Sequence, residues 1–370
     1  MRQSFGILVL LSILFCAQSV QAKITIAMIA PMAGDYAVQG QELIKGAEHA
    51  VEELNQQGGV LKNKISLLKI DDQCNDSIAL STAQMLTILK DKKISAIIGP
   101  YCANALANIT EIYAQAKIFQ IIPVPVNYLL ENVSHKGLVK LLGHSDQEAK
   151  DFFAFYNSRY AGDRVALVYN TKNQDSVAAA QSVAQEFLKH GKSSLISEYT
   201  YQMTEKDYEA LADKILADNV RTAFLFGSSA NIRKIAYELR QKNKKFVIFT
   251  NRYKAGEKYF DLLEELANGT FFTGLSGSSD NPEFTETLVN LRLNGFDAEG
   301  ISLYGYAAIK LWATLAQKAK STDYDKLSAV VKNRTVPTVF GDKTFRNGAP
   351  KSNEKYAIYR YWKGTFVKVY

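Results

Sequence analysis

The sequence has 370 residues, of which 47% are hydrophobic and 22% are charged, and its formal net charge is +7 at neutral pH. These fractions are ordinary for a globular protein, and they exclude a low-complexity chain. The basic residues are scattered, often near expected helix ends, as at Arg240, Lys242, Lys244 and Lys245. They form no recognisable nucleic-acid-binding module, so we interpret them as a solvated basic surface and expect no nucleic-acid partner.

The first residues have the layout of a secretory signal peptide. Arg2 gives a short positive region, an apolar run follows from Phe5 to Phe15, and small or modest residues end it at 20–22. The run is too short to span a bilayer, which takes about 20 apolar residues. We therefore expect cleavage after Ala22 and localisation in the periplasm. The alternative is a lipoprotein signal lipidated at Cys16, although Phe15 stands where a small residue is normally required.

The expected mature chain, residues 23–370, is too long for one compact core and suits two lobes. Strands and helices alternate along it. The first set consists of strands at 23–29, 64–70, 94–98 and 118–122 with helices from 41, at 77–89 and at 103–116. The second set consists of helices at 146–156, 176–190, 207–217 and 231–242 with strands at 164–169, 194–201, 222–226 and 246–250. Such alternation predicts an α/β fold of two doubly wound parallel-sheet lobes. A helix at 304–320 and a terminal hairpin, 356–362 with 366–369, complete the chain.

Three cysteines are present, and Cys16 would leave with the signal peptide. Cys74 and Cys102 remain as an even pair in an oxidising compartment, and we expect a disulfide between them. They lie far apart in sequence, and the four histidines show no ligand spacing, so no metal site is expected.

Motifs of catalysis and cofactor binding are missing from the sequence. There is no Gly-x-Gly-x-x-Gly, no P-loop and no Gly-x-Ser-x-Gly. Gly227-Ser228-Ser229 follows an expected strand without a histidine to pair with it. Asp71-Asp72 after a strand is a paired acid, a solvated strand end or a helix-capping element. We therefore expect neither an enzyme nor a cofactor.

Open parallel sheets bind ligands in the crevice beyond the carboxyl ends of their strands. The loops at those ends are 31–40, 99–104, 123–128, 169–176, 227–230 and 251–253, and they come from both expected lobes. A small molecule would be buried in the cleft between the lobes. The candidate ligand-binding residues on these loops are Tyr36, Gln39, Tyr101, Ala103, Asn104, Val124, Val126, Asn127, Gln174, Ser228 and Arg252.

Six stretches of the chain resemble one family, the type I periplasmic binding proteins, in particular the leucine/isoleucine/valine-binding branch of ABC importers. The stretches are Ile26–Gly40, Gly46–Leu68, Asp71–Asp76, Ile97–Ala105, Tyr304–Leu315 and Phe340–Gly348. Cys74 and Cys102 fall in the two segments that resemble those holding the family disulfide.

The resemblance implies three chain crossings between the lobes, near 143, 273 and 335. The N-terminal lobe would be 23–142 with 274–335, and the C-terminal lobe 143–273 with 336–370. The resemblance also implies a monomer that closes on its ligand by a hinge and delivers it to an inner-membrane ABC permease. A ligand sensor that contacts a receptor is the alternative.

The positions that carry ligand contacts in this family have changed here. Where amino-acid binders use hydroxyls for the α-carboxylate, the aligned residues are Ala103 and Val126, although backbone donors can remain. Where an aromatic residue and an acid face the α-ammonium, the aligned residues are Ser228 and Arg252. An arginine repels an ammonium and can grip a carboxylate, unless it points to solvent instead. The ligand is therefore expected to be amino acid-like or a small organic acid, beside an apolar wall made by Val124, Pro125 and Val126 with Tyr36, Tyr101 and Tyr128.

Overall fold

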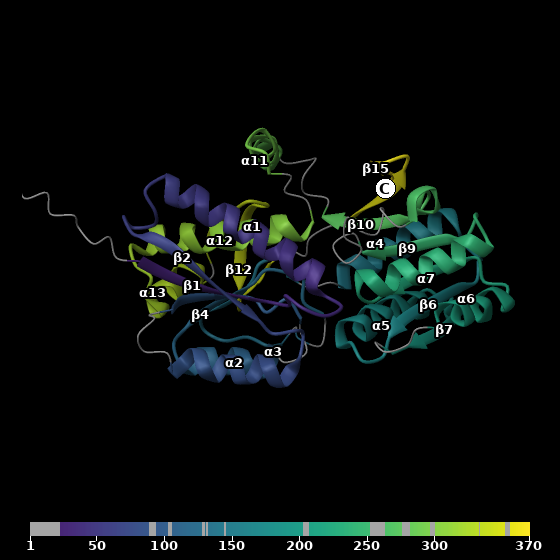
Figure 1. The fold of residues 1–370 in the computed structure, drawn as a ribbon, viewed down its shortest axis with the longest axis horizontal. Coiled ribbons are helices and arrows are strands. Elements are labelled where there is room, and N and C mark those ends of the chain that lie inside the picture. The colour runs from purple at the N-terminus through teal and green to yellow at the C-terminus, as the bar shows by residue number, and fades with distance from the viewer. Residues whose placement is uncertain are drawn as a thin grey trace, which may run out of the picture.

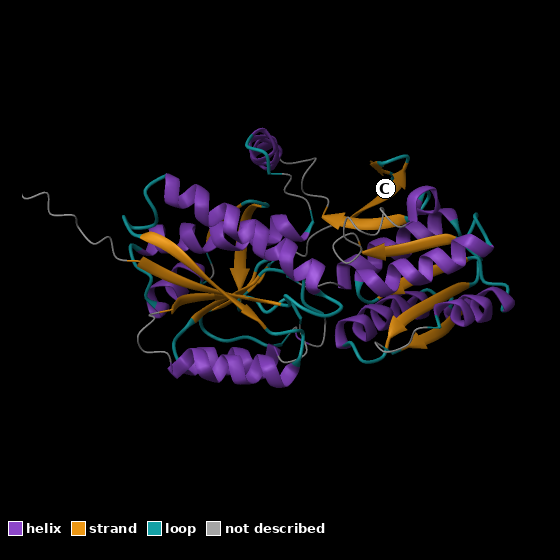
Figure 2. Ribbon diagram, viewed as in Figure 1, coloured by secondary structure: helices purple, strands orange, loops and turns teal. Residues whose placement is uncertain are grey.

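The computed structural model describes residues 23–88, 94–102, 106–127, 130, 132–143, 146–202, 207–251, 263–275, 282–296, 300–332, 334–351 and 356–370. The expected signal peptide, residues 1–22, lies outside this part. Two lobes lie side by side along the long axis of the molecule, each a sheet between helices (Figures 1 and 2). The α/β prediction with parallel-sheet lobes is confirmed. Within the described residues, no helix has both the length and the apolar character needed to cross a membrane.

Lobe one is built on a five-stranded parallel sheet in the order β2-β1-β3-β4-β5. Its strands are β1 (Lys23–Ala30), β2 (Lys64–Asp71), β3 (Ile94–Ile98), β4 (Phe119–Ile122) and β5 (Leu138–Lys140). One face packs on α1 (Ala37–Gln56), α12 (Ile301–Ala319) and α13 (Tyr324–Val331), and the other on α2 (Asp76–Ile88) and α3 (Leu106–Gln115). Side chains alternate along β1, because Ile26 and Met28 join the first core whereas Ala27 and Ile29 join the second.

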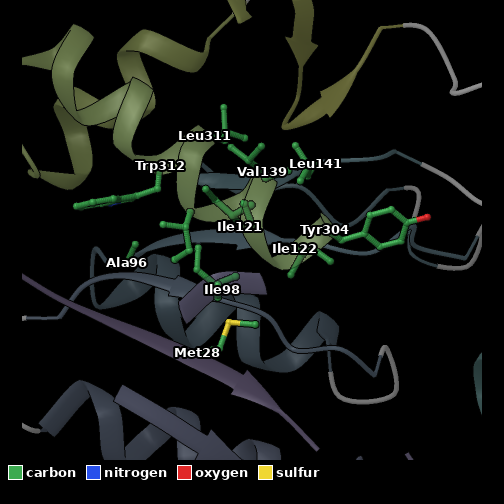
Figure 3. Close-up of a cluster of buried hydrophobic side chains, with 14 of the residues drawn as sticks. Met28, Ala96, Ile98, Ile121, Ile122, Val139, Leu141, Tyr304, Leu311 and Trp312 are labelled. Carbon is green, nitrogen blue, oxygen red and sulfur yellow. The ribbon is translucent and has the colours of Figure 1, made fainter. Parts of the chain in front are cut away.

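The helices α1 and α12 approach each other through two glycines. A Cβ added to Gly46 would lie 1.7 Å from the Ser302 carbonyl oxygen, and one on Gly305 would lie 2.0 Å from that of Leu43. Only residues without a side chain allow the two backbones to come this close. The close contact holds α12 against the sheet, where the fully buried Trp312 packs among the strand residues drawn in Figure 3.

Lobe two is built on a seven-stranded sheet in the order β15-β14-β10-β9-β8-β6-β7. Its strands are β6 (Val165–Asn170), β7 (Ile196–Tyr201), β8 (Thr222–Phe226), β9 (Val247–Asn251), β10 (Phe271–Leu275), β14 (Tyr356–Trp362) and β15 (Thr365–Lys368). Its two faces are covered by α4 (Asp146–Arg159) with α5 (Gln174–Lys189), and by α6 (Tyr208–Ala217) with α7 (Ser229–Lys242). The short helices η2 (Ser193–Leu195) and η3 (Glu264–Ala267) precede β7 and β10, respectively. The terminal hairpin predicted from the sequence is present as the antiparallel pair β14–β15.

A small third sheet packs on lobe one, near the third crossing that the resemblance predicts. A small sheet of β11 (Thr335–Thr338), β12 (Gly341–Arg346) and β13 (Ala349–Pro350) was assigned to lobe two, which was expected to resume at residue 336. Val336 and Phe345 are instead buried in the core of lobe one, as is Leu291 of α11 (Pro282–Leu293). Burial of these apolar side chains keeps the small sheet on lobe one, whereas Ile358 belongs to a core of lobe two.

Two hydrogen bonds gather the segments that cross between lobes at the start of α4. The Thr273 hydroxyl, at the end of lobe two that precedes the second crossing, donates to the Glu148 carboxylate. The Tyr356 backbone N–H, just after the third crossing, donates to Asp151 Oδ2 at 2.9 Å. The amino-terminal half of α4 therefore contacts β10 and the start of β14, near the crossings that the resemblance predicts.

Candidate functional site

A pocket lies between the lobes, at the edge where the parallel strands of both sheets end. The loops after β1, β3 and β4 form the lobe-one wall, with Tyr36, Tyr101, Cys102, Val124, Pro125 and Asn127. The starts of α4 and α5 and the end of β8 form the lobe-two wall. The position agrees with the rule for ligand sites in open parallel sheets.

The lobe-one wall carries two tyrosines whose hydroxyl groups are buried. Tyr36 and Tyr101 are 5% and 6% exposed, and their ring centroids lie 6.2 Å apart. Neither phenol oxygen has a hydrogen-bond partner among the described residues. Burial raises the pKa of both phenols, and the Asp175 carboxylate on the other lobe raises both further. These hydroxyls face the second lobe as neutral hydrogen-bonding groups.

A disulfide supports this wall, as the sequence predicted. Cys74 and Cys102 are bonded with their Cα atoms 5.4 Å apart, which ties the loop after β2 to the pocket loop after β3. The buried Asp72 accepts the Cys74 backbone N–H at 3.2 Å. Burial raises the pKa of Asp72 to about 6. Asp72 is therefore a buried carboxyl that closes the turn after β2, whereas the Asn75 side chain caps α2 by accepting the Ser77 and Ile78 N–H groups.

The lobe-two wall is more polar, and its groups are held by local hydrogen bonds. Asn173 caps α5 by accepting the Ser176 N–H at 2.7 Å, which places Asp175 in the first turn at the pocket. Glu148 is only 4% exposed and accepts from Thr273. One contact joins the walls, because Asn127 Nδ2 donates to Asp175 Oδ1 at 2.8 Å. Lobe one and lobe two therefore touch through a hydrogen bond inside the pocket.

The structure brings together only some of the residues expected in the site. Tyr36, Tyr101, Val124 and Asn127 line the pocket, together with the disulfide residue Cys102. Gln39 and Val126 are buried but do not line it, Gln174 is exposed, and the Ser228 hydroxyl caps α7 by accepting the Asn231 N–H at 3.3 Å. Ala103, Asn104, Tyr128 and Arg252 lie outside the described residues.

The lobe-two lining of the pocket was largely missed by the sequence. It includes Glu148, Phe152, Asp175, Ala179, Ser182, Val183 and Phe226. Positions 175, 179, 182 and 183 follow the helical spacing i, i+4, i+7 and i+8 and so share one face of α5. That spacing, in a helix expected to begin at the crevice, was the available signal. Among the described residues, no group of three or more histidines, cysteines and carboxylates could hold a metal ion.

Comparison with known proteins identifies the family. A family model described as periplasmic binding protein matches residues 23–365. The chain belongs to the periplasmic binding protein family. Two similar members are an amino acid binding protein of Pseudomonas aeruginosa, 25% identical over 92% of this chain and 90% of the relative, and a Leu/Ile/Val-binding protein of Rhizobium johnstonii, 24% identical over 94% of both.

Solved periplasmic binding proteins share the fold over nearly the whole chain. A leucine binding protein of Thermotoga maritima superposes with a TM-score of 0.79, at 19% identity over 94% of this chain and 98% of that one. A solute binding protein of an R. palustris ABC transporter, in complex with benzoate, gives a TM-score of 0.80 at 15% identity over 94% of this chain and 96% of that one. The chain therefore has the fold of these binding proteins.

Proposed function

We propose that the protein is the solute-binding component of an ABC importer, which closes its interlobe cleft on a small molecule and presents it to an inner-membrane permease. The observation that carries this proposal is the pocket walled by both lobes and joined by the Asn127–Asp175 hydrogen bond. A site split between two lobes exists as a whole only when they close, which suits a protein that encloses its ligand and later releases it. Family membership and the contacts of α4 with β10 and β14 support hinge closure.

The ligand that we propose is amino acid-like or a small organic acid. Relatives are named for amino acids, and a protein of the same fold has been solved with benzoate. The argument for an acid rests on Arg252, a cation where the family's pattern has the acid that faces an ammonium. Two buried phenols and an apolar patch at Val124 and Pro125 suit a ligand that combines an apolar body with a few polar groups.

The same proposal extends to the location and state of the protein. The expected signal peptide directs it to the periplasm with cleavage after Ala22, where it acts as a monomer and binds its ligand without chemistry. A receptor-linked sensor of the same fold remains the second candidate. The neighbouring genes distinguish them, because an importer is expected beside genes for a permease and an ATPase.

A thermal-shift screen of residues 23–370 tests the proposal. The panel holds the proteinogenic amino acids, small mono- and dicarboxylates, and apolar acids such as benzoate. A ligand that binds only the folded protein stabilises it by about 2.7 kcal/mol at a hundredfold excess over Kd. We expect a shift with at least one acid, and loss of that shift in Tyr101→Ala but not in Tyr237→Ala, an exposed aromatic on α7.

Arg252→Ala then separates the two ligand classes. An acid held by the guanidinium is expected to bind this variant at least about tenfold more weakly. Equal binding by parent and variant would overturn the role of Arg252. A shift with leucine, isoleucine or valine alone would mean that the protein binds the family's usual ligand, an aliphatic amino acid. If no compound shifted the melting temperature and the protein instead converted one of the compounds to a product, the proposed binding function would be overturned.

A further inference from the structure

A second groove lies on lobe two, away from the interlobe pocket. It is lined at the starts of β9 and β10 by Val247 and Phe271, whereas the interlobe pocket lies where the strands end. The end of α4 and strand β14 form its other sides, through Arg159 and Arg360. The two sites therefore occupy opposite edges of the same sheet, and the proposed solute site does not account for this groove.

The groove is strongly basic. Five cations line it, namely Arg159, Arg240, Lys244, Lys245 and Arg360, and none of the described lining residues carries a carboxylate side chain. Arg240 has a structural role, because its Nη1 donates to the Leu266 and Asn268 carbonyl oxygens at 3.1 and 2.5 Å. The other four cations take part in none of the ion pairs found between described residues. The sequence predicted that these lysines belong to a scattered, solvated basic surface. In the fold they line the same groove as the arginines.

Aromatic rings, not carboxylates, orient the guanidinium groups. Arg360 lies over the Trp362 ring with its Cζ 4.5 Å from the centroid, and Arg159 lies over Phe155 at 5.8 Å. Arg360 Nε is buried and has no hydrogen-bond partner among the described residues. Stacking fixes the plane of a guanidinium and leaves its N–H donors for an anion.

The phenol of Tyr160 lies in the positive electrostatic field of the groove's arginines. Burial raises the pKa of this phenol, whereas Arg360, Arg159 and Arg240 act in the opposite direction. Asp163 is the acid close enough to act on the same hydroxyl, and its effect is smaller than those of Arg360 and Arg159. Guanidinium groups from α4, α7 and β14 therefore line the same groove and act on the same phenol.

We propose that this groove is a binding site for a phosphate-bearing anion. Arg159, Lys244, Lys245 and Arg360 have no carboxylate partner among the described residues. Four positive charges exceed the charge of a single carboxylate, whereas a phosphate carries more charge and more acceptor oxygens. Planar guanidinium forks match the oxygen pairs of a phosphate, and the lysines add point charges at the rim. The phosphate can belong to a free anion or to the headgroup of an anionic phospholipid, for which the exposed Trp362 would be an interfacial anchor.

The test compares matched variants of the mature protein. Arg159→Gln with Lys244→Gln removes two exposed groove cations, and Lys318→Gln with Lys326→Gln removes two exposed cations from lobe one. Inorganic phosphate binding is measured by calorimetry at low ionic strength. Co-sedimentation is measured with vesicles of phosphatidylglycerol and phosphatidylcholine in equal parts, and with phosphatidylcholine alone. Melting temperatures check that each variant is folded.

We expect the parent and the lobe-one variant to bind alike and the groove variant to bind about 30-fold more weakly. Loss with inorganic phosphate assigns a free anion, and loss only with phosphatidylglycerol vesicles assigns a lipid headgroup. Arg360→Gln is expected to reproduce the loss, and Arg360→Lys to restore only part of it. Absence of binding by the parent, equal weakening of both double variants, or groove-dependent binding of poly-glutamate alone would overturn the proposal.

Discussion

The two lobes hold their sides of the cleft by different means. Lobe one relies on a disulfide between loops, and the buried hydroxyls of its Tyr36 and Tyr101 have no partner among the described residues. Lobe two has no cysteine in its described residues. Its Tyr201 is also buried, but the hydroxyl of this tyrosine donates to the Phe226 carbonyl oxygen at 2.9 Å. The Tyr201 hydroxyl is therefore satisfied within lobe two, whereas the Tyr36 and Tyr101 hydroxyls keep hydrogen-bonding capacity that a bound solute can meet.

The interiors differ in the same way. Phe249, on the central strand β9, stacks on Phe224 with ring centroids 4.7 Å apart and on Phe271 at 5.2 Å. Phe152 and Phe155 of α4 meet the Phe249 ring edge-on. Aromatic packing therefore stabilises lobe two, whereas the disulfide and the close α1–α12 contact stabilise lobe one.

The largest effect is expected from removing the centre of the aromatic stack. Phe249→Ala deletes a fully buried ring and leaves a cavity, so the free energy of unfolding should fall by about 3–5 kcal/mol. Urea denaturation followed by circular dichroism measures it, with Tyr237→Ala on the exposed face of α7 as the control, expected within about 0.5 kcal/mol. A loss under about 1 kcal/mol would mean that lobe two does not depend on this stack.

The corresponding change in lobe one removes its covalent link. Cys74→Ser with Cys102→Ser opens a loop spanning 28 residues, which the chain-entropy model values at about 3–4 kcal/mol. Treating the parent with a reductant should give the same loss, measured by the same denaturation experiment. If the double variant proved as stable as the parent, packing alone would hold the loop after β3.

The sequence predicted the repeating elements well and the site only on one side. Period and length were enough for the strongly patterned helices and for the terminal hairpin. Strand β5 has three residues, and β11–β13 are fixed by burial of Val336 and Phe345 against another part of the chain, so local pattern could not find them. Strand ends pointed to Tyr36 and Tyr101, but a helix face such as that of α5 becomes a wall only when the lobes meet.

Asp72 gives lobe one a pH dependence. Its pKa is about 6 in the fold and 3.8 as the ordinary value, so burial favours the protonated form. The stability that protonation provides is present below pH 4 and is lost as pH rises through 6. Asp72→Asn should therefore raise the free energy of unfolding by about 3 kcal/mol at pH 7.5 and change it little at pH 4. Urea denaturation curves of parent and variant at both pH values measure this difference. An equal change in the free energy of unfolding at pH 4 and pH 7.5 would show that it does not come from the ionisation of Asp72.

A matched pair of substitutions compares the two sides of the cleft directly. Tyr101→Phe removes a hydroxyl without a partner and should stabilise the solute-free protein by up to about 1 kcal/mol. Tyr201→Phe removes a hydroxyl that donates to Phe226 and should cost about 1 kcal/mol. Opposite signs support the contrast between the walls. The same sign for both, measured by urea denaturation, would show that the Tyr101 hydroxyl is already satisfied without solute.

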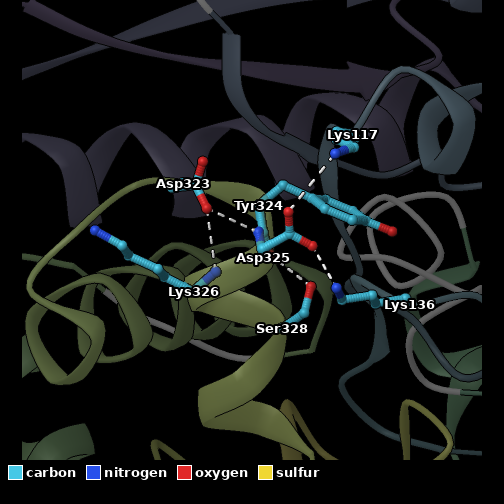
Figure 4. Close-up of polar contacts among 7 residues, drawn as sticks. All are labelled: Lys117, Lys136, Asp323, Tyr324, Asp325, Lys326 and Ser328. Atoms are coloured by element: carbon cyan, nitrogen blue, oxygen red, sulfur yellow. Dashed lines mark hydrogen bonds and ion pairs between the residues drawn. The ribbon is translucent and has the colours of Figure 1, made fainter.

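The smallest effect is expected where lobe one is charged and exposed. Asp325 of α13 forms ion pairs with Lys117 at 3.8 Å and with Lys136 (Figure 4), and the contact with Lys136 lowers the pKa of the carboxyl. These side chains are 48–71% exposed, so solvent and salt screen the attraction. The cap of α13 comes instead from Asp323, which accepts the Asp325 and Lys326 N–H groups. Asp325→Asn should leave the melting temperature unchanged at physiological salt, whereas Asp323→Ala should lower it. A lower melting temperature for Asp325→Asn that persisted in high salt would show that the ion pairs, and not the cap, hold this helix.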